Sequence, residues 1–377
     1  MQYVPFDSLG FDVSRFGIGT MRLPTKSKKI DETQAIELIR HGIDKGVNYI
    51  DTAWPYHSEQ SEPLVGKALL DGYRERVRLT TKSPLWLCEK YEDYEKFLDE
   101  QLEKLATDCI DFYLLHALDK ARWKKHREMG VLNFLDDMVK KGKIKYPAFS
   151  FHDDYDTFVD IVDSYDWKMA QIQLNILDED NQATVKGLTY AGKKGIPVVI
   201  MEPLKGGKLA LDDNPAIRSI YDRYPEKRSS VEWAFRWLYR FPEVTVIISG
   251  VSNLDQLKEN LEIFDRVDMG PLNEEEKNIY QQVQEYYRQK MRVDCTACRY
   301  CLPCPQGVAI PDIFGQYNDS YMYDDLGWPV GRYRSMMSNK NGADACIECG
   351  ECESHCPQNI DIIEKLKEAH QWLTQER

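Results

Sequence analysis

The sequence lacks the features of a membrane-spanning or exported protein. No apolar run reaches the roughly 18 residues needed to cross a bilayer, and residues 1–10, MQYVPFDSLG, show no basic segment followed by an apolar stretch. Positive charge is also scarce, because 49 Lys and Arg stand against 62 Asp and Glu and the net charge is −13. Nucleic acid and anionic membrane surfaces are therefore poor candidates for partners. We expect a cytoplasmic protein, in which clustered cysteines indicate metal or redox chemistry rather than disulfides.

The first 270 residues alternate short apolar runs with amphipathic segments. The runs that we expect to form buried strands lie at residues 15–23, 48–53, 78–84, 110–116, 145–152, 170–177, 196–204 and 244–250. Eight strand–helix units within about 260 residues are typical of a (β/α)8 TIM barrel. A doubly wound α/β sheet is the alternative, but it usually carries a Gly-rich phosphate fingerprint, and GIGTMR at residues 17–22 does not complete G-x-G-x-x-G. The sequence therefore predicts an α/β fold with a TIM barrel.

Sequence patterns divide the chain into three parts. The predicted barrel covers residues 1–270, and the polar segment NEEEKNIYQQVQEYYRQK predicts a connecting helix over residues 271–290. The cysteine-rich residues 291–377 are expected to form a small second domain. Within the barrel, Asp31 can cap the helix that follows it and Gly46 can end that helix in a left-handed turn.

Polar side chains with catalytic potential fall at the ends of three neighbouring predicted strands. Asp51 ends the second strand, Lys82 the third and His116 the fourth. The loop after the second strand carries Tyr56. Because catalytic residues of a TIM barrel lie at the carboxyl ends of its strands, these four side chains are expected to face one pocket. His57, beside Tyr56, is interpreted as a loop residue that lines the pocket.

These residue types suit the reduction of a carbonyl group. A tyrosine phenol is a weak acid with a pKa of about 10, and a neighbouring ammonium such as that of Lys82 favours the phenolate and lowers this pKa. Asp51 can pair with Lys82 and hold it, while His116 can hydrogen-bond the substrate carbonyl oxygen. Tyr56 is then a general acid aimed at an oxygen that becomes an alkoxide.

Five ordered segments resemble the successive signatures of the aldo/keto reductase superfamily. They are GIGTMRL (17–23), YIDTAWPYHSE (49–59), LTTKSP (79–84), IDFYLLHALD (110–119) and IISGVSNLDQLKEN (247–260). The resemblance covers residues 10–265 and implies a tetrad of Asp51, Tyr56, Lys82 and His116, with Tyr56 as the general acid. It also implies an oxidoreductase that reduces a small aldehyde or ketone with NAD(P)H, or oxidises an alcohol in the reverse direction.

The same resemblance implies that NADP or NAD binds in extended form over the barrel mouth. Ser150 and Gln171 would contact the carboxamide, PLKGG at residues 203–207 would lie near the pyrophosphate, and the last signature would hold the adenosine end. The implied contacts are Thr20, Met21, Ser150, Gln171, Met201, Pro203, Leu204, Gly206, Ser249, Gly250, Gln256 and Asn260.

The chain departs from the family pattern at several of these contacts. Many members of the family carry a basic residue where Gly250 or Gln256 stands, and that residue pairs with the 2′-phosphate of NADP; the choice between NADP and NAD stays open. Met201 stands where the family often stacks a tyrosine on the nicotinamide. Phe151 and His152 follow Ser150 where an asparagine is common.

Eight of the ten cysteines lie in two runs near the end of the chain. Residues 295–305 read C-x2-C-x2-C-x2-C-P, and residues 346–357 read C-x2-C-x2-C-x3-C-P. Three thiolates at this spacing can wrap one corner of a cubane cluster, and in two-cluster ferredoxins the cysteine before the proline ligates the other cluster. The predicted ligands are Cys295, Cys298, Cys301 and Cys356 for one [4Fe–4S] cluster, and Cys346, Cys349, Cys352 and Cys304 for the other.

The cysteine region resembles the helical ferredoxin modules that are appended to larger redox enzymes, since residues 310–327 between its two runs have a helical pattern. Zinc is the alternative, but four-cysteine zinc sites usually pair two C-x2-C knuckles, and evenly spaced cysteines closed by proline fit that poorly. Cys88 and Cys109 stand apart from both runs and are interpreted as ordinary packed thiols.

Three functional hypotheses combine the two halves. The favoured one is the NAD(P)H-linked oxidoreductase above, in which the clusters exchange electrons with a redox partner protein or hold their domain together. The second is an oxidoreductase fed by the clusters, with a flavin in the barrel; the departures at Met201 and Phe151 are its support. The third is a redox sensor or electron-transfer subunit without catalysis, against which the complete tetrad argues.

Overall fold

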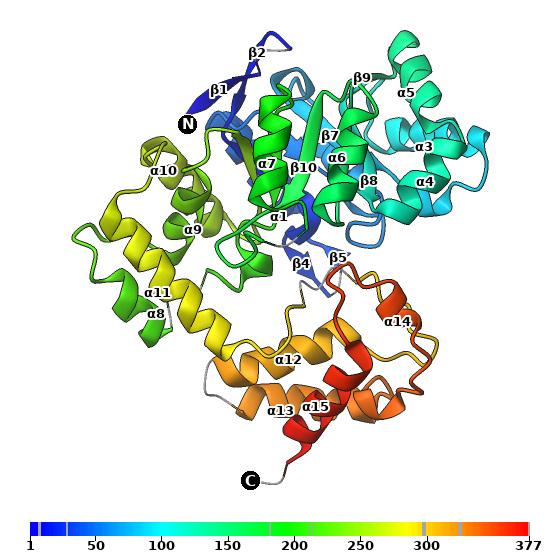
Figure 1. The fold of residues 1–377 in the computed structure, drawn as a ribbon. Helices are drawn as coiled ribbons and strands as arrows, with labels where there is room; N and C mark the ends of the chain where they lie inside the picture. The colour runs from blue at the N-terminus through cyan, green and yellow to red at the C-terminus, as the bar shows by residue number, and fades with distance from the viewer. Residues whose placement is uncertain are drawn as a thin grey trace. The chain divides into compact units, whose positions relative to one another are not determined.

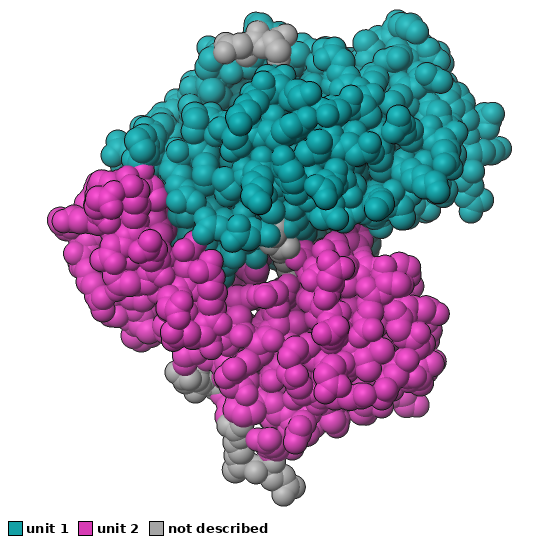
Figure 2. Space-filling view, in the orientation of Figure 1, with its two compact units in different colours: residues 1–204, 231–271 teal, residues 205–230, 272–377 magenta. Residues whose placement is uncertain are grey.

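A computed structural model describes residues 1–6, 9–27, 29–180, 182–210, 212, 214–295, 299–322 and 326–375. By its internal contacts the chain forms two compact units (Figure 2). The first holds residues 1–204 and 231–271, and the second holds residues 205–230 and 272–377. The domain boundaries expected at residues 270 and 290 stay predictions. The structure adds that residues 205–230, which leave the barrel after one of its strands, group with the carboxyl-terminal residues.

The first unit contains a closed barrel of eight parallel strands, in the order β10-β11-β12-β3-β6-β7-β8-β9. Its strands are β3 (Phe16–Gly19), β6 (Tyr49–Asp51), β7 (Arg78–Ser83), β8 (Ile110–Leu118), β9 (Ile144–Phe151), β10 (Met169–Gln173), β11 (Val198–Met201) and β12 (Val244–Gly250). Each overlaps one of the eight apolar runs, with β8, β9 and β10 extending one or two residues beyond theirs, so the predicted TIM barrel is confirmed. The strands are buried on both faces, which is why they read as continuous apolar runs rather than as alternating ones.

Helices surround these strands, and α1, α6 and α7 are seen against them in Figure 1. The helices of this unit are α1 (Glu32–Asp44), α2 (Ser61–Ala68), α3 (Tyr91–Lys104), α4 (Lys120–Glu128), α5 (Val131–Lys140), α6 (Tyr155–Asp163), α7 (Thr184–Lys193), α9 (Ser230–Leu238) and α10 (Leu254–Arg266). The predicted ends of α1 are confirmed: Asp31 accepts a hydrogen bond from the Gln34 amide at 3.2 Å, and Gly46 has a φ of +99°.

A hairpin of β1 (Tyr3–Phe6) and β2 (Phe11–Ser14) packs against the barrel interior. Its Phe6 and Val13 belong to one buried apolar cluster with Tyr49 and Met169, the first residues of β6 and β10. The hairpin therefore closes the amino-terminal end of the barrel and leaves the carboxyl-terminal end for chemistry. Two short strands, β4 (Thr25–Lys26) and β5 (Lys29–Ile30), form a separate antiparallel pair after β3.

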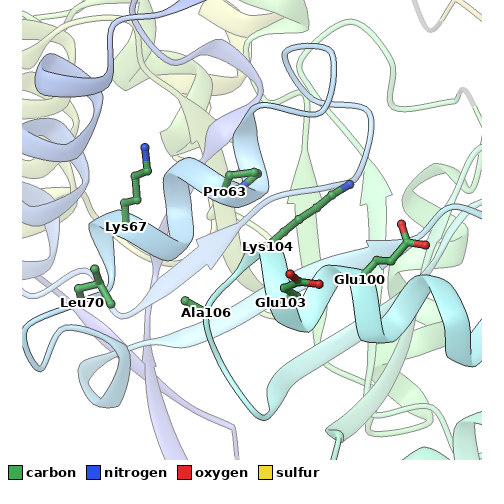
Figure 3. Close-up of a pocket in the computed structure, with 7 residues that line it drawn as sticks. All are labelled: Pro63, Lys67, Leu70, Glu100, Glu103, Lys104 and Ala106. Atoms are coloured by element: carbon green, nitrogen blue, oxygen red, sulfur yellow. The ribbon is translucent and has the colours of Figure 1, made fainter.

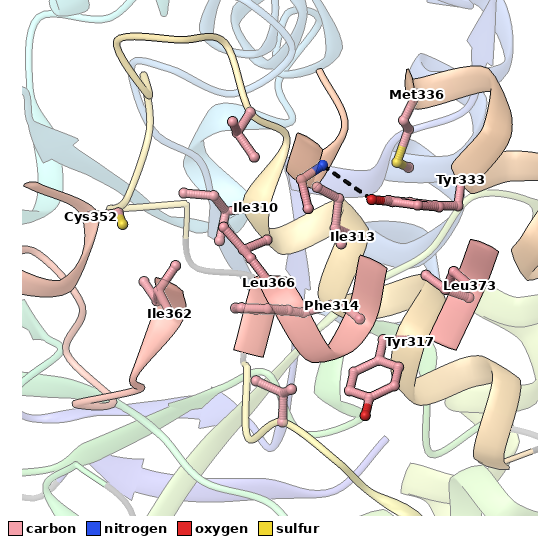
Figure 4. Close-up of a cluster of buried hydrophobic side chains, with 14 residues drawn as sticks. Ile310, Ile313, Phe314, Tyr317, Tyr333, Met336, Cys352, Ile362, Leu366 and Leu373 are labelled. Atoms are coloured by element: carbon pink, nitrogen blue, oxygen red, sulfur yellow. Dashed lines mark hydrogen bonds between the residues drawn. The ribbon is translucent and has the colours of Figure 1, made fainter. Parts of the chain in front are cut away.

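The second unit is helical. Its helices are α8 (Pro215–Tyr221), α11 (Glu274–Lys290), α12 (Ile310–Met322), α13 (Gly327–Ser338), α14 (Glu351–Ser354) and α15 (Ile362–Thr374). Side chains of α12, α13 and α15 form its core, in which the Ala343 amide donates to the Tyr333 hydroxyl at 3.2 Å (Figure 4). The expected helical second domain is confirmed. Among the described residues, no helix is both long and apolar enough to cross a membrane.

A buried ion pair explains why residues 205–230 group with the carboxyl-terminal residues. Arg228 lies 2.7 Å from Glu276 on α11, and both side chains are almost fully excluded from solvent. Asn273 caps α11 by accepting from the Glu276 amide at 2.8 Å, and its own side chain donates to the Tyr224 hydroxyl at 3.0 Å. The start of α11 thus holds residues 205–230 through Arg228 and Tyr224.

Candidate active site

Two members of the predicted tetrad, Asp51 and Tyr56, lie beside the ammonium group of a third, Lys82, at the carboxyl end of the barrel. Lys82 on β7 donates to both carboxylate oxygens of Asp51, which ends β6, at 2.8 Å each. The same Nζ donates to the carbonyl oxygen of Thr52 at 2.8 Å and lies 3.4 Å from the hydroxyl of Tyr56. Tyr56 is therefore placed beside a fixed positive charge, as the strand-end pattern predicted.

His116, the fourth member, lies on β8 with its ring next to that of Tyr56. The two ring centroids are 6.5 Å apart and the planes are nearly perpendicular, at 81°. Burial first, and the nearby charge of Lys82 second, hold the pKa of His116 well below its usual value. The imidazole is therefore neutral at pH 7. Its Nδ1 is buried and has no hydrogen-bond partner among the described residues.

The electrostatics differ from expectation in one respect. Burial disfavours the Lys82 ammonium, but Asp51 and Tyr56 outweigh it, and the pKa of Lys82 is raised. Burial also raises the pKa of Tyr56, and Lys82 opposes that effect without overcoming it. Lys82 thus acts in the predicted direction while the net pKa of Tyr56 stays above its usual value. The phenol is protonated at neutral pH, which suits a proton donor.

The residues expected at the nicotinamide carboxamide lie on adjacent strands. Gln171 of β10 is paired in register with Ser150 of β9, and its Nε2 lies 3.8 Å from the sulfur of Met201 on β11. Gln171 Oε1 is buried without a hydrogen-bond partner among the described residues. Ser150 Oγ accepts from the Ala117 amide at 2.8 Å, so its hydroxyl hydrogen can be donated elsewhere. One acceptor and one donor complement a carboxamide, so these residues fit a nicotinamide.

The other expected contacts fall at several strand ends. Thr20 is buried and donates to the Asp51 carbonyl at 3.0 Å, whereas Met21 is 56% exposed; both lie in the short 3-10 helix η1 (Thr20–Arg22). Pro203 and Leu204 follow β11. Gly206 lies in the second compact unit with a φ of +70°, within the 3-10 helix η4 (Lys205–Gly207).

The residues expected at the adenosine end lie on β12 and α10. Ser249 is buried and Gly250 exposed at the end of β12, and Asn260 is buried on α10. The amide oxygen of Gln256 accepts from the Ser252 amide at 2.9 Å. The structure thus brings these four residues to one strand–helix junction, while their role as cofactor contacts stays a prediction.

Two residues at the barrel mouth were missed by the sequence analysis. Arg22 lies directly against Gly250, since a Cβ on that glycine would be 3.1 Å from the Arg22 Cβ and 3.3 Å from its Cγ. Trp86 is 44% exposed, and its ring centroid is 5.3 Å from that of His116. Arg22 lies within the segment GIGTMRL and Trp86 follows LTTKSP by two residues, but their neighbours come from distant strands, so their positions depend on the closed barrel.

The cysteine runs surround the core of the second unit. Cys352 belongs to that core, and Cys295, Cys301, Cys304, Cys346 and Cys356 pack against it. Cys349 is exposed, and Cys298 lies outside the described residues. Within the described part of the chain no three His, Cys, Asp or Glu side chains stand close enough together to hold a metal ion.

The two cysteine runs share one backbone feature among the residues that the structure describes. The residue after the second cysteine is left-handed in both, Arg299 with a φ of +69° and Gly350 with a φ of +79°. The Glu348 amide donates to the Cys346 sulfur at 3.4 Å. Cysteines of both runs pack at one apolar core, and thiol donors of this number fit iron–sulfur clusters by their chemistry. Cys88 is different, because burial raises the pKa of its thiol to about 12, consistent with a packed side chain.

The fold and the strand-end tetrad define an oxidoreductase barrel. The family model of the aldo/keto reductase family matches residues 15–285, which is most of the chain. The chain therefore belongs to this family. The family model of a 4Fe-4S dicluster domain matches residues 294–360, which hold all eight cysteines expected to bind clusters. The resemblance drawn from the five sequence segments and the cysteine runs is thereby confirmed.

Several known proteins share the barrel. The aldo-keto reductase YhdN of Bacillus subtilis is 37% identical over 128 residues, a match that spans 32% of this chain and 39% of that protein. A probable aldo-keto reductase of Glycine max is 25% identical over 296 residues, or 69% of this chain and 84% of that protein.

Solved structures show the same fold. An aldo-keto reductase from Bacillus halodurans in its holo form aligns with a TM-score of 0.62 at 24% identity, covering 75% of this chain and 96% of that one. An aldo/keto reductase from Klebsiella pneumoniae, in complex with NADP and acetate, aligns with a TM-score of 0.60 at 22% identity, covering 73% of this chain and 93% of that one.

Proposed function

We propose that this chain reduces a small aldehyde or ketone with a nicotinamide cofactor, or oxidises the corresponding alcohol, with Tyr56 as the general acid. The observation that carries the proposal is the position of Lys82, whose ammonium lies 2.8 Å from both oxygens of Asp51 and 3.4 Å from the Tyr56 hydroxyl. A half-buried phenol beside a fixed cation can give its proton to a developing alkoxide, because the cation stabilises the phenolate that forms.

Each member of the tetrad has a separate task. His116 is neutral, so it can donate or accept a hydrogen bond at the substrate oxygen without adding charge. Asp51 keeps Lys82 protonated inside the barrel. Tyr56 transfers its proton to the carbonyl oxygen, and Lys82 stabilises the negative charge left on the phenolate. Trp86, exposed beside His116, can shield the reacting carbonyl from water.

Ser150 and Gln171 would hold the nicotinamide through its carboxamide. A bound nicotinamide supplies or accepts a hydride at the carbonyl carbon. NADP is the cofactor that we favour, because the side chain of Arg22 runs past Gly250, at the junction where the family's cation is missing from Gly250 and Gln256, and its charge can serve in place of that cation. The Klebsiella pneumoniae relative was solved with NADP, which agrees with this choice.

The second unit is proposed to bind two [4Fe–4S] clusters. Cys295, Cys298, Cys301 and Cys356 would ligate one cluster, and Cys346, Cys349, Cys352 and Cys304 the other. Because a cluster moves one electron and a nicotinamide moves two, transfer between them needs an intermediate carrier such as a flavin. We therefore propose that the clusters exchange electrons with a redox partner protein, in a compartment reducing enough to keep thiolates available.

The catalytic proposal is tested by an anaerobic assay of NADPH and NADH oxidation with a panel of small aldehydes and ketones. Wild-type protein should turn over at least one carbonyl, and Tyr56→Phe should lose on the order of a hundredfold or more in kcat. Tyr190→Phe is the matched control, because its hydroxyl bonds Asp163 at 2.9 Å on the outside of the barrel. Unchanged turnover in Tyr56→Phe would refute the proposed acid.

The cluster proposal is tested by adding NADPH anaerobically, without a carbonyl, while the visible absorption of the clusters is followed. No bleaching is expected if the barrel works by hydride transfer alone. Bleaching would instead favour the alternative of a flavin-containing enzyme, and flavin fluorescence after denaturation would then identify the carrier.

A further inference from the structure

Glu62 is a buried carboxyl group that the reaction proposed above does not use. It lies in the first turn of α2, immediately after the loop that carries Tyr56, and it is 1% exposed. One carboxylate oxygen, Oε1, accepts hydrogen bonds from Thr81 Oγ1 at 2.6 Å and from Gln101 Nε2. The other, Oε2, is buried without a hydrogen-bond partner among the described residues. Burying a carboxylate oxygen without a hydrogen-bond partner costs stability, so we expect that Glu62 serves a function.

The contacts of Glu62 lead directly to the strand that carries Lys82. Thr81 precedes Lys82 on β7, and Gln101 Nε2 donates to the Lys82 carbonyl at 3.1 Å as well as to Glu62. The Tyr113 hydroxyl on β8 holds the other end of Gln101, at 2.8 Å from Oε1. The backbone at Lys82 is thus fixed from α2, α3 and β8 at once.

The residue before Glu62 ties the same helix start to two further strand ends. Ser61 Oγ lies 2.7 Å from Thr20 Oγ1 and 2.9 Å from Thr52 Oγ1, and the Ser61 amide donates to the Tyr56 carbonyl at 3.3 Å. The start of α2 therefore connects the loop that holds Tyr56 with the ends of β3, β6 and β7.

The loop between Tyr56 and α2 is under strain. Three consecutive residues, His57, Ser58 and Glu59, have left-handed backbones with φ values of 53°, 53° and 68°, and none of them is glycine. Such conformations persist only where the surroundings enforce them. The hydrogen bonds made by Ser61 and Glu62 help to hold this loop at its carboxyl end, together with the ion pair of Glu59 with Lys104.

We propose that Glu62 is a positioning residue, which holds the Tyr56 loop against β7 and thereby keeps the Tyr56 hydroxyl within reach of the Lys82 ammonium. This inference rests on the proposed function, since it assigns Glu62 a part in the work of Tyr56 as an acid. Without Glu62 the start of α2 loses its bond to Thr81, and the loop can relax away from β7.

The charged groups around both side chains set the direction of the pH effect. Tyr56 faces Lys82 on β7, Asp51 on β6, Glu202 after β11 and the ring of His116 on β8. Of these only Lys82 lowers the pKa of Tyr56. A longer distance between Lys82 and Tyr56 therefore raises the pKa that limits activity at alkaline pH. Glu62 itself faces Lys104 on α3 and Lys82.

The test compares Glu62→Ala with Glu62→Gln, whose side-chain oxygen can still accept from Thr81 and Gln101. Glu62→Ala should lower kcat on the order of 10- to 100-fold, with the KM for NADPH and for the carbonyl within about 3-fold of wild type. The alkaline limb of its kcat profile should move to higher pH. Glu62→Gln should recover most of kcat and restore the alkaline limb.

Glu103→Ala is the control, because Glu103 lies on α3 near the same helix pair but is exposed and lines a separate surface pocket (Figure 3). It should leave kcat unchanged. If Glu62→Ala does not fold, two single variants, Glu62→Gln and Thr81→Val, replace it in the test. A lower kcat and a displaced alkaline limb in Thr81→Val, but not in Glu62→Gln, would support the proposal. An unmoved alkaline limb in every variant that folds would overturn it.

Tyr56→Phe in the same assay separates this inference from the function on which it rests. Full activity of Tyr56→Phe would refute the proposed acid. An inactive Tyr56→Phe together with a fully active Glu62→Ala would refute only the role given to Glu62.

Discussion

Lys82 and Asp51 form an ion pair that is almost fully excluded from water. Nζ lies 2.8 Å from the carboxylate, and the two side chains are 1% and 4% exposed. Such a pair holds only while both partners are present, because removing one leaves the other as an uncompensated buried charge. Changing either residue alone is therefore expected to lower stability as well as activity.

Asp51→Asn should destabilise the protein by about 3 kcal/mol, because the Lys82 ammonium would lose its counter-charge. Activity should fall as well, since the pKa of Lys82 would drop and a neutral amine cannot stabilise a phenolate. The double variant Asp51→Asn with Lys82→Met should recover much of the stability while remaining inactive. Thermal unfolding and kcat of the three variants check this. Equal stability of Asp51→Asn and wild type would contradict the buried pair.

The barrel and the tetrad could be predicted because both follow from local pattern. Asp51, Lys82 and His116 each end an apolar run, and parallel strands of a barrel bring their carboxyl ends together whatever the loops do. The position of Tyr56 needs only the short loop after one of these runs. These inferences require no knowledge of which helix packs on which.

Other features depend on contacts between distant residues and had no readable signal. Glu62 meets Gln101 only because α2 and α3 pack side by side against β7, and Arg22 meets Gly250 only because β3 and β12 are neighbours in the closed barrel. The grouping of residues 205–230 with the second unit depends on Arg228 and Glu276, which are distant in the sequence. Net burial at Tyr56, which outweighs Lys82, likewise cannot be judged from residue types.

Arg22→Met should weaken the binding of NADPH while leaving the binding of NADH nearly unchanged. A guanidinium that contacts the 2′-phosphate contributes about 1.4 kcal/mol or more, so the KM for NADPH should rise about tenfold or more. The ratio of kcat/KM for the two cofactors is the measurement. Lys168→Met is the matched control, because Lys168 is a cation at the amino-terminal end of β10, paired with Asp166. A rise in KM for both cofactors alike would contradict a role specific to the 2′-phosphate.

His126 should make the barrel sensitive to acid. It is buried, its Nδ1 lies 2.6 Å from the Tyr94 hydroxyl, and burial lowers the pKa of its imidazole to about 4. In the unfolded chain a histidine binds its proton near pH 6.5, so between about pH 6.5 and pH 4 the unfolded state holds more protons. The contribution of the neutral histidine to the free energy of unfolding is therefore fully present above pH 6.5. The free energy of unfolding falls as the pH drops below 6.5, by about 1.4 kcal/mol per pH unit for each such histidine.

The comparison of wild type with His126→Gln isolates this contribution. His152 and His116 also have lowered pKa values, so the variant should show a shallower loss of stability rather than none. Urea unfolding at a series of pH values between 7 and 5 is the measurement. Parallel curves for the two proteins would contradict this prediction, because they would show that His126 takes up its proton at the same pH in the folded and the unfolded chain.

Cys349→Ser should remove one cluster and leave the other. Cys349 lies in the second cysteine run and is the exposed member of its predicted ligand set, so its loss opens that cluster to solvent without disturbing the apolar core that Cys352 enters. Iron analysis of anaerobically purified protein should fall from about eight to about four atoms per chain. Cys88→Ser is the control, since its thiol is buried in the barrel unit and protonated at neutral pH, and it should keep all the iron. Retention of all the iron by Cys349→Ser would remove Cys349 from the ligand set, and complete loss would mean that the two clusters assemble together.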